Sequence, residues 1–480
     1  MPIKNNNLIA IIVGKALQII IMLISIRVMT SILDEKEIGQ NYLLLTILTL
    51  LNFGFWLPTC QYFSRKTLAW RESENLKNAV DLMFIFRCVT AFISLIIGYI
   101  IFYVNDYERY YTNTEFLLFI FISSIATFSL LLLSTINMLG KQVLFTKLNI
   151  LLSIFTLTFS VFIVIYIDGS AMSWLYGIAF SQIIMSVPLY VIVVKNQTLK
   201  IKNTFESLNL DKIKSVLIFT APITITLFLQ WGQNFSYRFF VEAKYSIELL
   251  GMMGVGLAIA TAIFSAVDNV ACQFFNPIYF KSINQTTPPE KRARAKIWNS
   301  YSIKMFSIYI STLLFIISTA PYLLKILVSE KFHSVYPFVM AGALVEFCRV
   351  CCNAVYMISQ SELSTKTTIM PYSVGYICLV FMLYFMDLSA NPIFITFIQA
   401  FSYIIIILIL YKKMSLLLEV KVDFRYLIKL LIVSFPLAIC LLLPYNVPVI
   451  YALAIVAFAG IYFIFVLYTF VYKLYLRELF

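Results

Sequence analysis

Seven ionisable residues lie inside long apolar stretches of the sequence, where charged side chains are rare. Five are cationic and two are anionic: Lys15, Arg27, Arg87, Lys304 and Arg349, and Asp268 and Glu346. An ionisable side chain inside a bilayer costs about 2.5–3.5 kcal/mol on insertion scales, so each is a candidate for function. Arg and Lys match phosphate groups. We therefore interpret the five cations as candidate substrate ligands for something anionic, and the two acids as candidate sites for a coupling proton or sodium ion.

Several of these residues also have a purely structural explanation. Glu346 and Arg349 are three residues apart on one helix face and can form a local ion pair. Arg27 lies near the end of its apolar stretch, where a long side chain reaches the membrane surface. The small residues beside the charges suit tight helix packing as well as a cavity wall. One ion pair for each acid still leaves three cations unmatched, which favours a water-filled cavity that holds an anionic substrate.

The stretches that carry these charges are long enough to cross a membrane. The chain has 480 residues, of which 61% are hydrophobic and 12% charged, and its mean hydropathy is +0.90. A helix needs about 20 apolar residues to span the hydrocarbon core. Runs of that kind predict fourteen spanning helices, near residues 8–33, 42–62, 79–104, 116–139, 146–167, 172–194, 213–237, 249–273, 298–324, 335–360, 367–386, 392–411, 427–444 and 449–472.

The basic residues between the spans predict the orientation of the chain. The net charge is +13, and 25 of the 36 Lys and Arg residues fall on the side that holds both termini, against 6 on the other side. Basic loops stay in the cytoplasm, so both termini are expected there. The positive charge is thereby explained by anionic membrane lipids, and we expect no nucleic-acid partner.

The residue types of common enzyme sites are scarce. His333 is the only histidine, and seven of the eight cysteines lie within apolar runs, where they behave as small hydrophobic residues. The sequence contains no P-loop, no His-Glu-x-x-His and no Gly-x-Ser-x-Gly motif. We therefore expect a transporter with no catalytic residues, no metal and no cofactor.

Two segments of the sequence repeat one another. Gly39 is followed after 21 residues by Cys60-Gln61-Tyr62-Phe63, and Gly251 is followed after 21 residues by Cys272-Gln273-Phe274-Phe275. Six spans separate the copies, an even number, which predicts a parallel repeat of two six-helix halves. We accordingly divide the chain into an N-lobe (1–194), a cytoplasmic linker (195–212), a C-lobe (213–411) and two further helices with the C-terminal tail (412–480).

The first 70 residues or so resemble a known family. This part of the chain resembles the start of the polysaccharide-biosynthesis flippases, the Wzx-type translocases of O-antigen and similar repeat units. The resemblance lies in the order of four segments: Gly14-Lys15-Ala16-Leu17-Gln18, Arg27 to Leu33, Glu37-Ile38-Gly39-Gln40-Asn41-Tyr42 and Asn52-Phe53-Gly54-Phe55. These are grouped with the multidrug and toxin extruders and the lipid II flippases. The resemblance implies an all-α membrane protein with two parallel six-helix lobes in a MATE-like arrangement, plus two C-terminal helices.

The resemblance also implies a function and its partners. The expected substrate is an oligosaccharide repeat unit on undecaprenyl pyrophosphate, carried across a bacterial inner membrane by alternating access. The resemblance also implies that cationic side chains line the transport lumen and meet the acidic substrate. In this chain they would be Lys15, Arg27 and Arg87 in the first lobe and Lys304 and Arg349 in the second. Partners would include membrane lipids and the polymerase and chain-length proteins of the same pathway. The alternatives are a lipid II flippase, a cation-coupled drug exporter, or a membrane-embedded glycan polymerase or acyltransferase.

Overall fold

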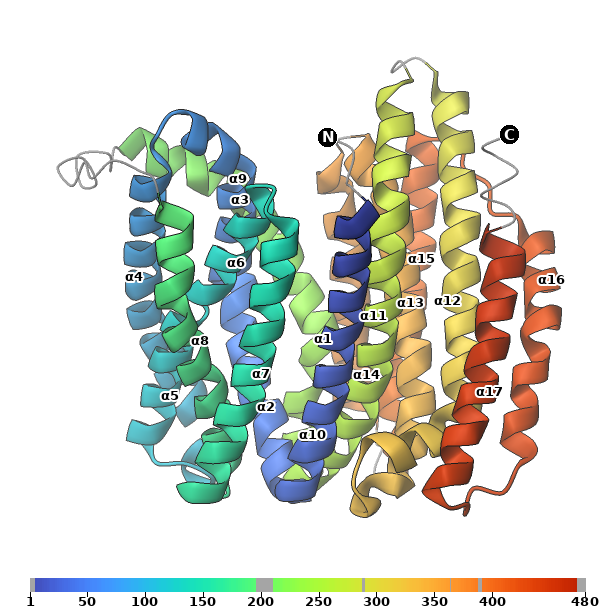
Figure 1. Ribbon diagram of the computed structural model, residues 1–480, viewed down its shortest axis with the longest axis horizontal. Coiled ribbons are helices and arrows are strands. Elements are labelled where there is room, and N and C mark those ends of the chain that lie inside the picture. Colours follow the sequence, from blue (N-terminus) through green and yellow to red (C-terminus); the bar gives the residue numbers. More distant parts are fainter. Residues whose placement is uncertain (1–4, 196–209, 287–289, 363, 387–390, 473–480) are drawn as a thin grey trace. The chain divides into compact units, whose positions relative to one another are not determined.

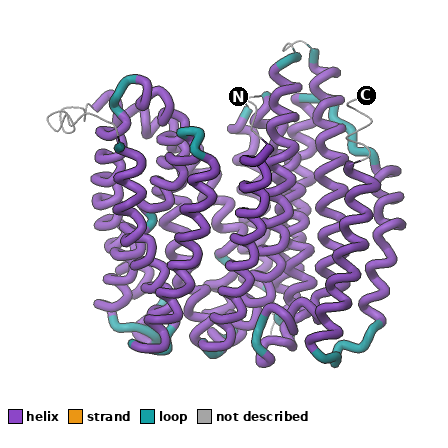
Figure 2. Tube along the Cα trace, in the orientation of Figure 1, coloured by secondary structure: helices purple, strands orange, loops and turns teal. Residues whose placement is uncertain are grey.

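The computed structural model describes residues 5–195, 210–286, 290–362, 364–386 and 391–472, and every regular element among them is helical (Figures 1 and 2). The elements in chain order are α1 (Asn5–Ile32), α2 (Glu35–Leu51), η1 (Asn52–Trp56), α3 (Leu57–Glu72), α4 (Leu76–Val104), η2 (Tyr107–Arg109), α5 (Asn113–Ala126), α6 (Phe128–Met138), α7 (Gln142–Tyr166), α8 (Ala171–Val194), α9 (Leu210–Phe235), α10 (Tyr237–Lys244), α11 (Ile247–Asn284), α12 (Lys291–Leu327), η4 (Glu330–Val335), α13 (Tyr336–Ser361), η5 (Thr365–Thr368), α14 (Ile369–Phe385), α15 (Ile393–Leu417), α16 (Phe424–Ser434), η6 (Phe435–Leu442), α17 (Val449–Leu467) and η7 (Tyr468–Tyr472).

The prediction of an all-α protein with fourteen spanning helices is confirmed. By length and composition, 14 helical segments of the described chain can cross a membrane. Two of these helices extend well beyond the apolar runs that predicted them. They are α11, with 38 residues, and α12, with 37. Hydropathy marks only the part of a helix that lies in hydrocarbon, whereas backbone hydrogen bonding continues into polar sequence at its end. The structure therefore assigns to α12 several basic residues that the sequence placed in a loop.

The second span is interrupted by a π-helical turn, η1. At its end the Leu57 N–H donates to the Asn52 carbonyl, five residues back rather than four. Pro58 follows immediately, and it has no N–H to continue an α-helical pattern. Such turns are uncommon inside helices and often mark functional sites. Trp56, the last residue of this turn, is buried.

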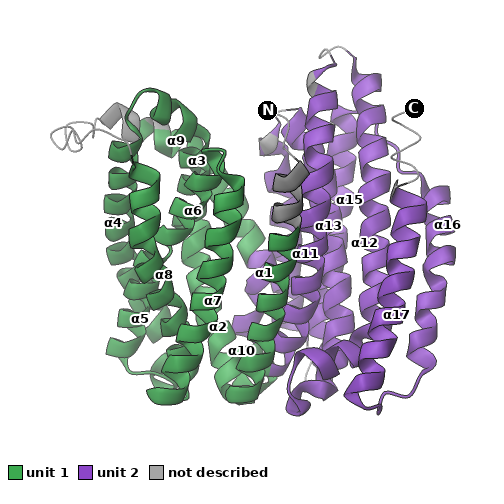
Figure 3. Cartoon of the chain, in the orientation of Figure 1, with its two compact units in different colours: residues 1–231, 241–251 green, residues 232–240, 252–480 purple. Residues whose placement is uncertain are grey.

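The chain forms two compact units, each with its own core (Figure 3). Unit 1 contains residues 1–231 and 241–251, and unit 2 contains residues 232–240 and 252–480. In unit 1, α7 packs along α8 and α1, and Leu132, Ile136 and Leu189 are fully buried in the core. In unit 2, α13 packs along α15, and α12 packs along α13 and α17. The lobe boundaries at 194 and 213 remain a prediction.

The thirteenth span changes its helical type halfway. It runs as the α-helix α16 to Ser434 and then as the 3₁₀-helix η6, which has Pro436 near its start. The end of η6 is held by Tyr322, whose hydroxyl lies 2.9 Å from the Cys440 carbonyl oxygen. One turn further along α12, Lys325 Nζ donates to the Val447 carbonyl at 2.7 Å. Backbone carbonyls at the end of η6 and in the loop that follows thus find partners on α12.

Candidate functional site

Arg87 occupies the interior of unit 1. Its side chain projects from α4 and is only 2% exposed. Nη1 donates to Thr127 Oγ1 at 3.0 Å, Nη2 donates to Cys60 Sγ at 3.3 Å, and the guanidinium lies 5.1 Å from the centroid of the Trp56 ring. Nε is buried and makes no hydrogen bond. Arg87 is therefore enclosed by uncharged groups and an aromatic face.

The groups around Arg87 come from the irregular points of the neighbouring helices. Trp56 is the last residue of the π-helical turn, and its Nε1 donates to Thr90 Oγ1 at 3.2 Å. Thr127 lies at the break between α5 and α6. Of the ion pairs formed in the described part of the chain, none involves Arg87. A buried cation without a carboxylate partner is costly, which makes this site the most unusual electrostatic feature of unit 1.

Lys15 and Arg27 lie on α1 at separate places. Lys15 is partly buried, donates from Nζ to Gln18 Oε1 at 3.3 Å and lies 5.7 Å from the centroid of the Phe145 ring on α7. Arg27 is exposed and is 12 residues further along, about 18 Å along the helix axis. The structure therefore does not gather Lys15 and Arg27 into one cluster.

Glu346 and Arg349 form the ion pair that their spacing allows. Arg349 donates from Nε and Nη2 to Glu346 Oε2, at 2.8 and 2.7 Å. The other carboxylate oxygen of Glu346 accepts a hydrogen bond from Thr261 Oγ1 of α11 at 2.9 Å. Both oxygens of Glu346 thus have donors, and the pair ties α13 to α11 in unit 2.

Asp268, the other acid that the sequence singled out as a candidate, has only uncharged hydrogen-bond donors among the described residues. Its Oδ1 accepts hydrogen bonds from the Tyr309 hydroxyl of α12 and from the Cys272 thiol at 3.4 Å. The sequence reasoning allowed each acid one cationic partner. Within the described residues, only Glu346 has one, because no ion pair includes Asp268. Asp268 and Glu346 therefore differ in their hydrogen-bond donors, although the charge of Arg349 acts on both carboxylates.

Lys304 lies in a basic cavity between α11 and α12. It is 6% exposed, and its Nζ donates to Ser300 Oγ at 3.1 Å. The cavity has a volume of about 280 Å³ and includes Lys296 in its wall. The sequence singled out Lys304 but not Lys296, because the predicted span begins at residue 298. The helix α12 begins seven residues earlier, at Lys291, and therefore includes Lys296.

A second group of polar residues in unit 2 was missed altogether. Gln399 Nε2 donates to the carbonyl oxygens of Gln233 and Asn234 near the end of α9, at 3.2 and 3.3 Å. Gln233 Nε2 donates to Ser402 Oγ, and the Tyr403 hydroxyl donates to Asn234 Oδ1. The Gln399 side chain satisfies two carbonyls that the end of α9 leaves without helical partners. No sequence pattern indicates these contacts, because Gln233 and Gln399 are 166 residues apart in the chain.

A further ion pair in unit 1 joins the segment between α4 and α5 to α10. Arg109 pairs with Glu242, and the Tyr110 hydroxyl donates to Glu242 Oε1 at 3.0 Å. Burial, reinforced by the charge of Glu242, raises the pKa of Tyr110 to about 12. Residues 241–251, which follow the predicted start of the second half, are thus bound firmly into unit 1.

The structure is similar to several solved transporters. One is the lipid II flippase MurJ in an inward closed conformation, with a TM-score of 0.71, 11% identity, and coverage of 98% of this chain and 100% of that one. Others are an inward-facing multidrug resistance MATE family transporter of the MOP superfamily (TM-score 0.53, 12% identity, 83% of this chain and 95% of that one) and a MOP superfamily transporter from Pyrococcus furiosus Vc1 (TM-score 0.52, 12% identity, 85% and 94%). No family profile and no curated protein matches the sequence.

These similarities establish the fold as that of the MOP-superfamily membrane transporters. At 11–12% identity they establish nothing finer. The match to the lipid II flippase covers 98% of the chain, so it extends over α16 and α17, whereas the match to the MATE transporter covers 83%. The similarity shows a shared fold, and membership of the polysaccharide repeat-unit flippases stays a prediction.

Proposed function

We propose that this protein moves an oligosaccharide repeat unit, linked to a polyprenyl diphosphate, from the cytoplasmic to the outer leaflet of a bacterial inner membrane. The observation that carries the proposal is Arg87, a 2% exposed guanidinium with no carboxylate partner among the described residues. A protein retains such a charge inside a membrane span when it serves a function, and transport of a phosphate-bearing lipid supplies one.

The other cations are assigned to the same substrate. We propose that Lys15, Arg27 and Arg87 of unit 1, together with Lys304 and Arg349 of unit 2, meet the diphosphate and any acidic sugars at successive stages of transport. Guanidinium and ammonium groups form charge-assisted hydrogen bonds with phosphate oxygens. Arg349 is engaged by Glu346 in this structure, so its contact with substrate requires that ion pair to open.

The two acids are assigned to a coupling ion. Both oxygens of Glu346 have donors, one of them cationic, whereas within the described part of the chain Asp268 accepts only from the uncharged Tyr309 and Cys272. Asp268 is therefore the better candidate for binding a proton or a sodium ion. Replacement of Asp268 by Asn is expected to remove the dependence of transport on the ion gradient while leaving the protein in the membrane.

Lipid II translocation is the second candidate, and the fold match over 98% of the chain favours it. Both candidate substrates are polyprenyl diphosphates that carry sugars, so the basic residues suit either one. A drug exporter differs from both, because its substrates need no phosphate ligands. Deletion of the gene distinguishes the three functions, because each predicts a different result: accumulated repeat units, accumulated lipid II, or increased drug sensitivity.

The decisive experiment is deletion in the native host, followed by extraction of lipid-linked saccharides. The proposal expects single repeat units to accumulate on the cytoplasmic leaflet and surface glycan to disappear. Complementation with wild type and with Lys412→Ala, an exposed position far along the chain from the named cations, should restore the glycan. Accumulation of lipid II would support the second candidate. Normal surface glycan together with increased drug sensitivity would overturn both.

A further inference from the structure

A row of polar side chains lies on one face of α11. Asp268, Cys272 and Asn276 are spaced by four residues, so they occupy successive turns of the helix. The next turn carries Tyr279. With both termini in the cytoplasm, as the basic loops predict, α11 runs inward from its start at Ile247. The row therefore leads from Asp268, the candidate for ion binding, toward the cytoplasmic end of the helix.

Hydrogen bonds connect this row to α12. The Cys272 thiol donates to Asp268 Oδ1 at 3.4 Å and also interacts with the Asn276 side chain. Asn276 Oδ1 accepts a hydrogen bond from the Tyr301 hydroxyl of α12 at 2.9 Å. We call these four residues, Asp268, Cys272, Asn276 and Tyr301, the polar ladder. Their side chains form a continuous line of polar atoms from Asp268 to Tyr301.

The donors around Asp268 suit a proton better than a sodium ion. Tyr309, which donates to Asp268 Oδ1, is only 1% exposed, and Tyr301 is 5% exposed. A hard cation needs several oxygen ligands. The carboxylate oxygen here faces a hydroxyl and a thiol that both donate to it. A proton needs only one carboxylate oxygen, so this setting favours a proton as the coupled ion.

The ionisable groups that act on Asp268 come from three helices. They are Cys272 on its own helix, Tyr301 and Tyr309 on α12, and Arg349 and Cys351 on α13. Arg349 forms its ion pair with Glu346. Within the described residues, the Asp268 carboxylate thus has hydrogen-bond donors but no ion-pair partner.

The polar ladder ends at the basic cavity. Tyr301 lines this cavity together with Tyr279, Lys296 and Lys304, and the volume of about 280 Å³ has room for several water molecules. None of the described residues in its wall is acidic. The two ammonium groups lower the local concentration of protons. A proton that reaches the cavity is therefore favoured to leave it.

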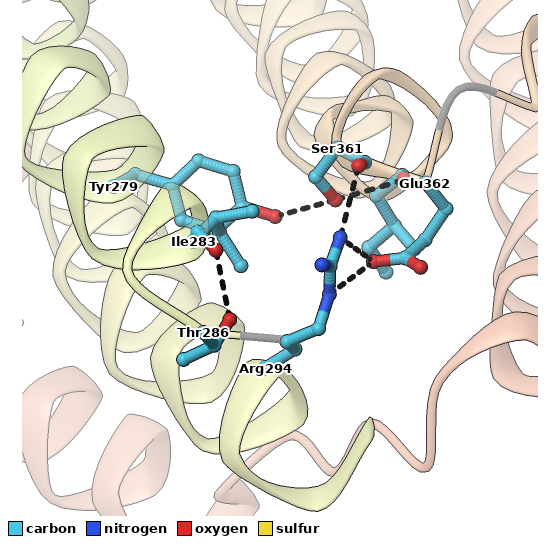
Figure 4. Close-up of polar contacts among 7 residues, drawn as sticks. Tyr279, Ile283, Thr286, Arg294, Ser361 and Glu362 are labelled. Carbon is cyan, nitrogen blue, oxygen red and sulfur yellow. Dashed lines mark hydrogen bonds and ion pairs between the residues drawn. The ribbon is translucent and has the colours of Figure 1, made fainter. Parts of the chain in front are cut away.

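Contacts among three helices hold the wall of the cavity in place (Figure 4). Tyr279 donates from its hydroxyl to Ser361 Oγ at 3.0 Å, and its ring centroid lies 4.9 Å from that of Tyr301. Arg294 of α12 donates to Glu362 Oε1 at 2.9 and 2.7 Å and to the Ser361 carbonyl at 3.0 Å. The ends of α11, α12 and α13 are thus joined beside the last member of the polar ladder.

We propose that the polar ladder is the route by which Asp268 releases its proton to the cytoplasm. The carboxylic O–H bond breaks, the proton passes to water molecules that enter from the basic cavity, and one proton leaves the far end of that water chain. Asp268 returns to the carboxylate, which accepts from Tyr309 and Cys272 as in this structure. Asn276 and Tyr301 are positioning residues, because their polar atoms hold the water chain. The proposal rests on the proposed function, since it makes the proton the ion that is coupled to transport.

Infrared difference spectroscopy of the full chain in phosphatidylcholine nanodiscs tests this route. The band of a protonated carboxyl that is missing in Asp268→Asn belongs to Asp268, and its decay after a rapid rise in pH gives the rate of proton release. Tyr301→Phe and Asn276→Leu are each expected to slow release roughly tenfold, since each removes a hydrogen-bonding group from the route. The pH at which half of the band is lost at equilibrium should stay as in wild type, because neither residue donates to the carboxylate.

Tyr322→Phe is the matched control. Tyr322 is a fully buried tyrosine on the same helix, and its hydroxyl donates to the Cys440 carbonyl, so this variant should release the proton at the wild-type rate. Wild-type rates in both Tyr301→Phe and Asn276→Leu, or a shifted equilibrium midpoint with an unchanged rate, would overturn the route. A band that responds to sodium and not to pH would overturn the choice of the proton. The measurement uses no substrate, so the route can fail while the deletion experiment still supports the proposed function.

Discussion

Gly39 and Gly251 make reciprocal contacts with each other's helix in unit 1. A Cβ atom added at Gly39 would lie 1.9 Å from the Ile247 carbonyl oxygen, and one added at Gly251 would lie 2.1 Å from the Glu35 carbonyl oxygen. Glu35 and Ile247 are separated by the same number of residues as Gly39 and Gly251. The internal repeat inferred from the sequence therefore coincides with a pair of equivalent contacts between the starts of α2 and α11.

Gly39→Ala and Gly251→Ala should each destabilise the protein by about 2 kcal/mol or more, because the added methyl group meets a backbone carbonyl that cannot rotate away. Thermal unfolding in detergent measures the effect. Gly460→Ala is the matched control, since nothing lies within 4 Å of a Cβ at that position. An unchanged melting temperature for Gly39→Ala would contradict the close approach of these helices.

Arg87→Met separates a role in transport from a role in folding. Replacing a buried charge by an apolar side chain of similar length is often neutral or stabilising. We therefore expect a melting temperature at or above that of wild type, together with at least a tenfold loss of surface glycan in a complemented deletion strain. Glycan at the wild-type level would mean that the charge of Arg87 has no part in transport.

The ion pair between Glu346 and Arg349 should show energetic coupling. Glu346→Gln leaves the guanidinium without its counter-charge and should lower the free energy of unfolding by about 2 kcal/mol. Arg349→Gln added to it should recover part of that loss. A double-mutant cycle from chemical denaturation gives the coupling energy. Strict additivity of the two changes would show that the pair contributes nothing to stability.

The contact between Tyr110 and Glu242 should weaken only at high pH. The pKa of Tyr110 is raised to about 12 from an ordinary value near 10, so the folded state holds the phenolic proton more tightly than the unfolded state. Its contribution to stability is complete below pH of about 10 and is lost as pH rises through about 12. The difference in absorbance at about 295 nm between wild type and Tyr110→Phe isolates this group. A midpoint near 10 would contradict the burial of the hydroxyl.

The features that the sequence predicted depend on local patterns. The spans follow from the length of apolar runs, and the Glu346–Arg349 pair follows from a spacing of three residues on a helix. The contacts that were missed connect residues far apart in the chain. Gln233 and Ser402 are 169 residues apart, and nothing in the periodicity of either helix indicates that they meet. The same is true of Arg87 and Thr127, whose contact depends on where α5 breaks.

The 3₁₀ segment of the thirteenth span determines how far that short span reaches. The segment from Phe424 to Leu442 has 19 residues and, as an α-helix throughout, would extend about 28 Å. Its last 8 residues rise about 2.0 Å each instead of 1.5 Å, which lengthens the span to about 32 Å. A hydrocarbon core is about 30 Å thick. The tighter winding of η6 therefore extends this short span from slightly less to slightly more than the thickness of the hydrocarbon core.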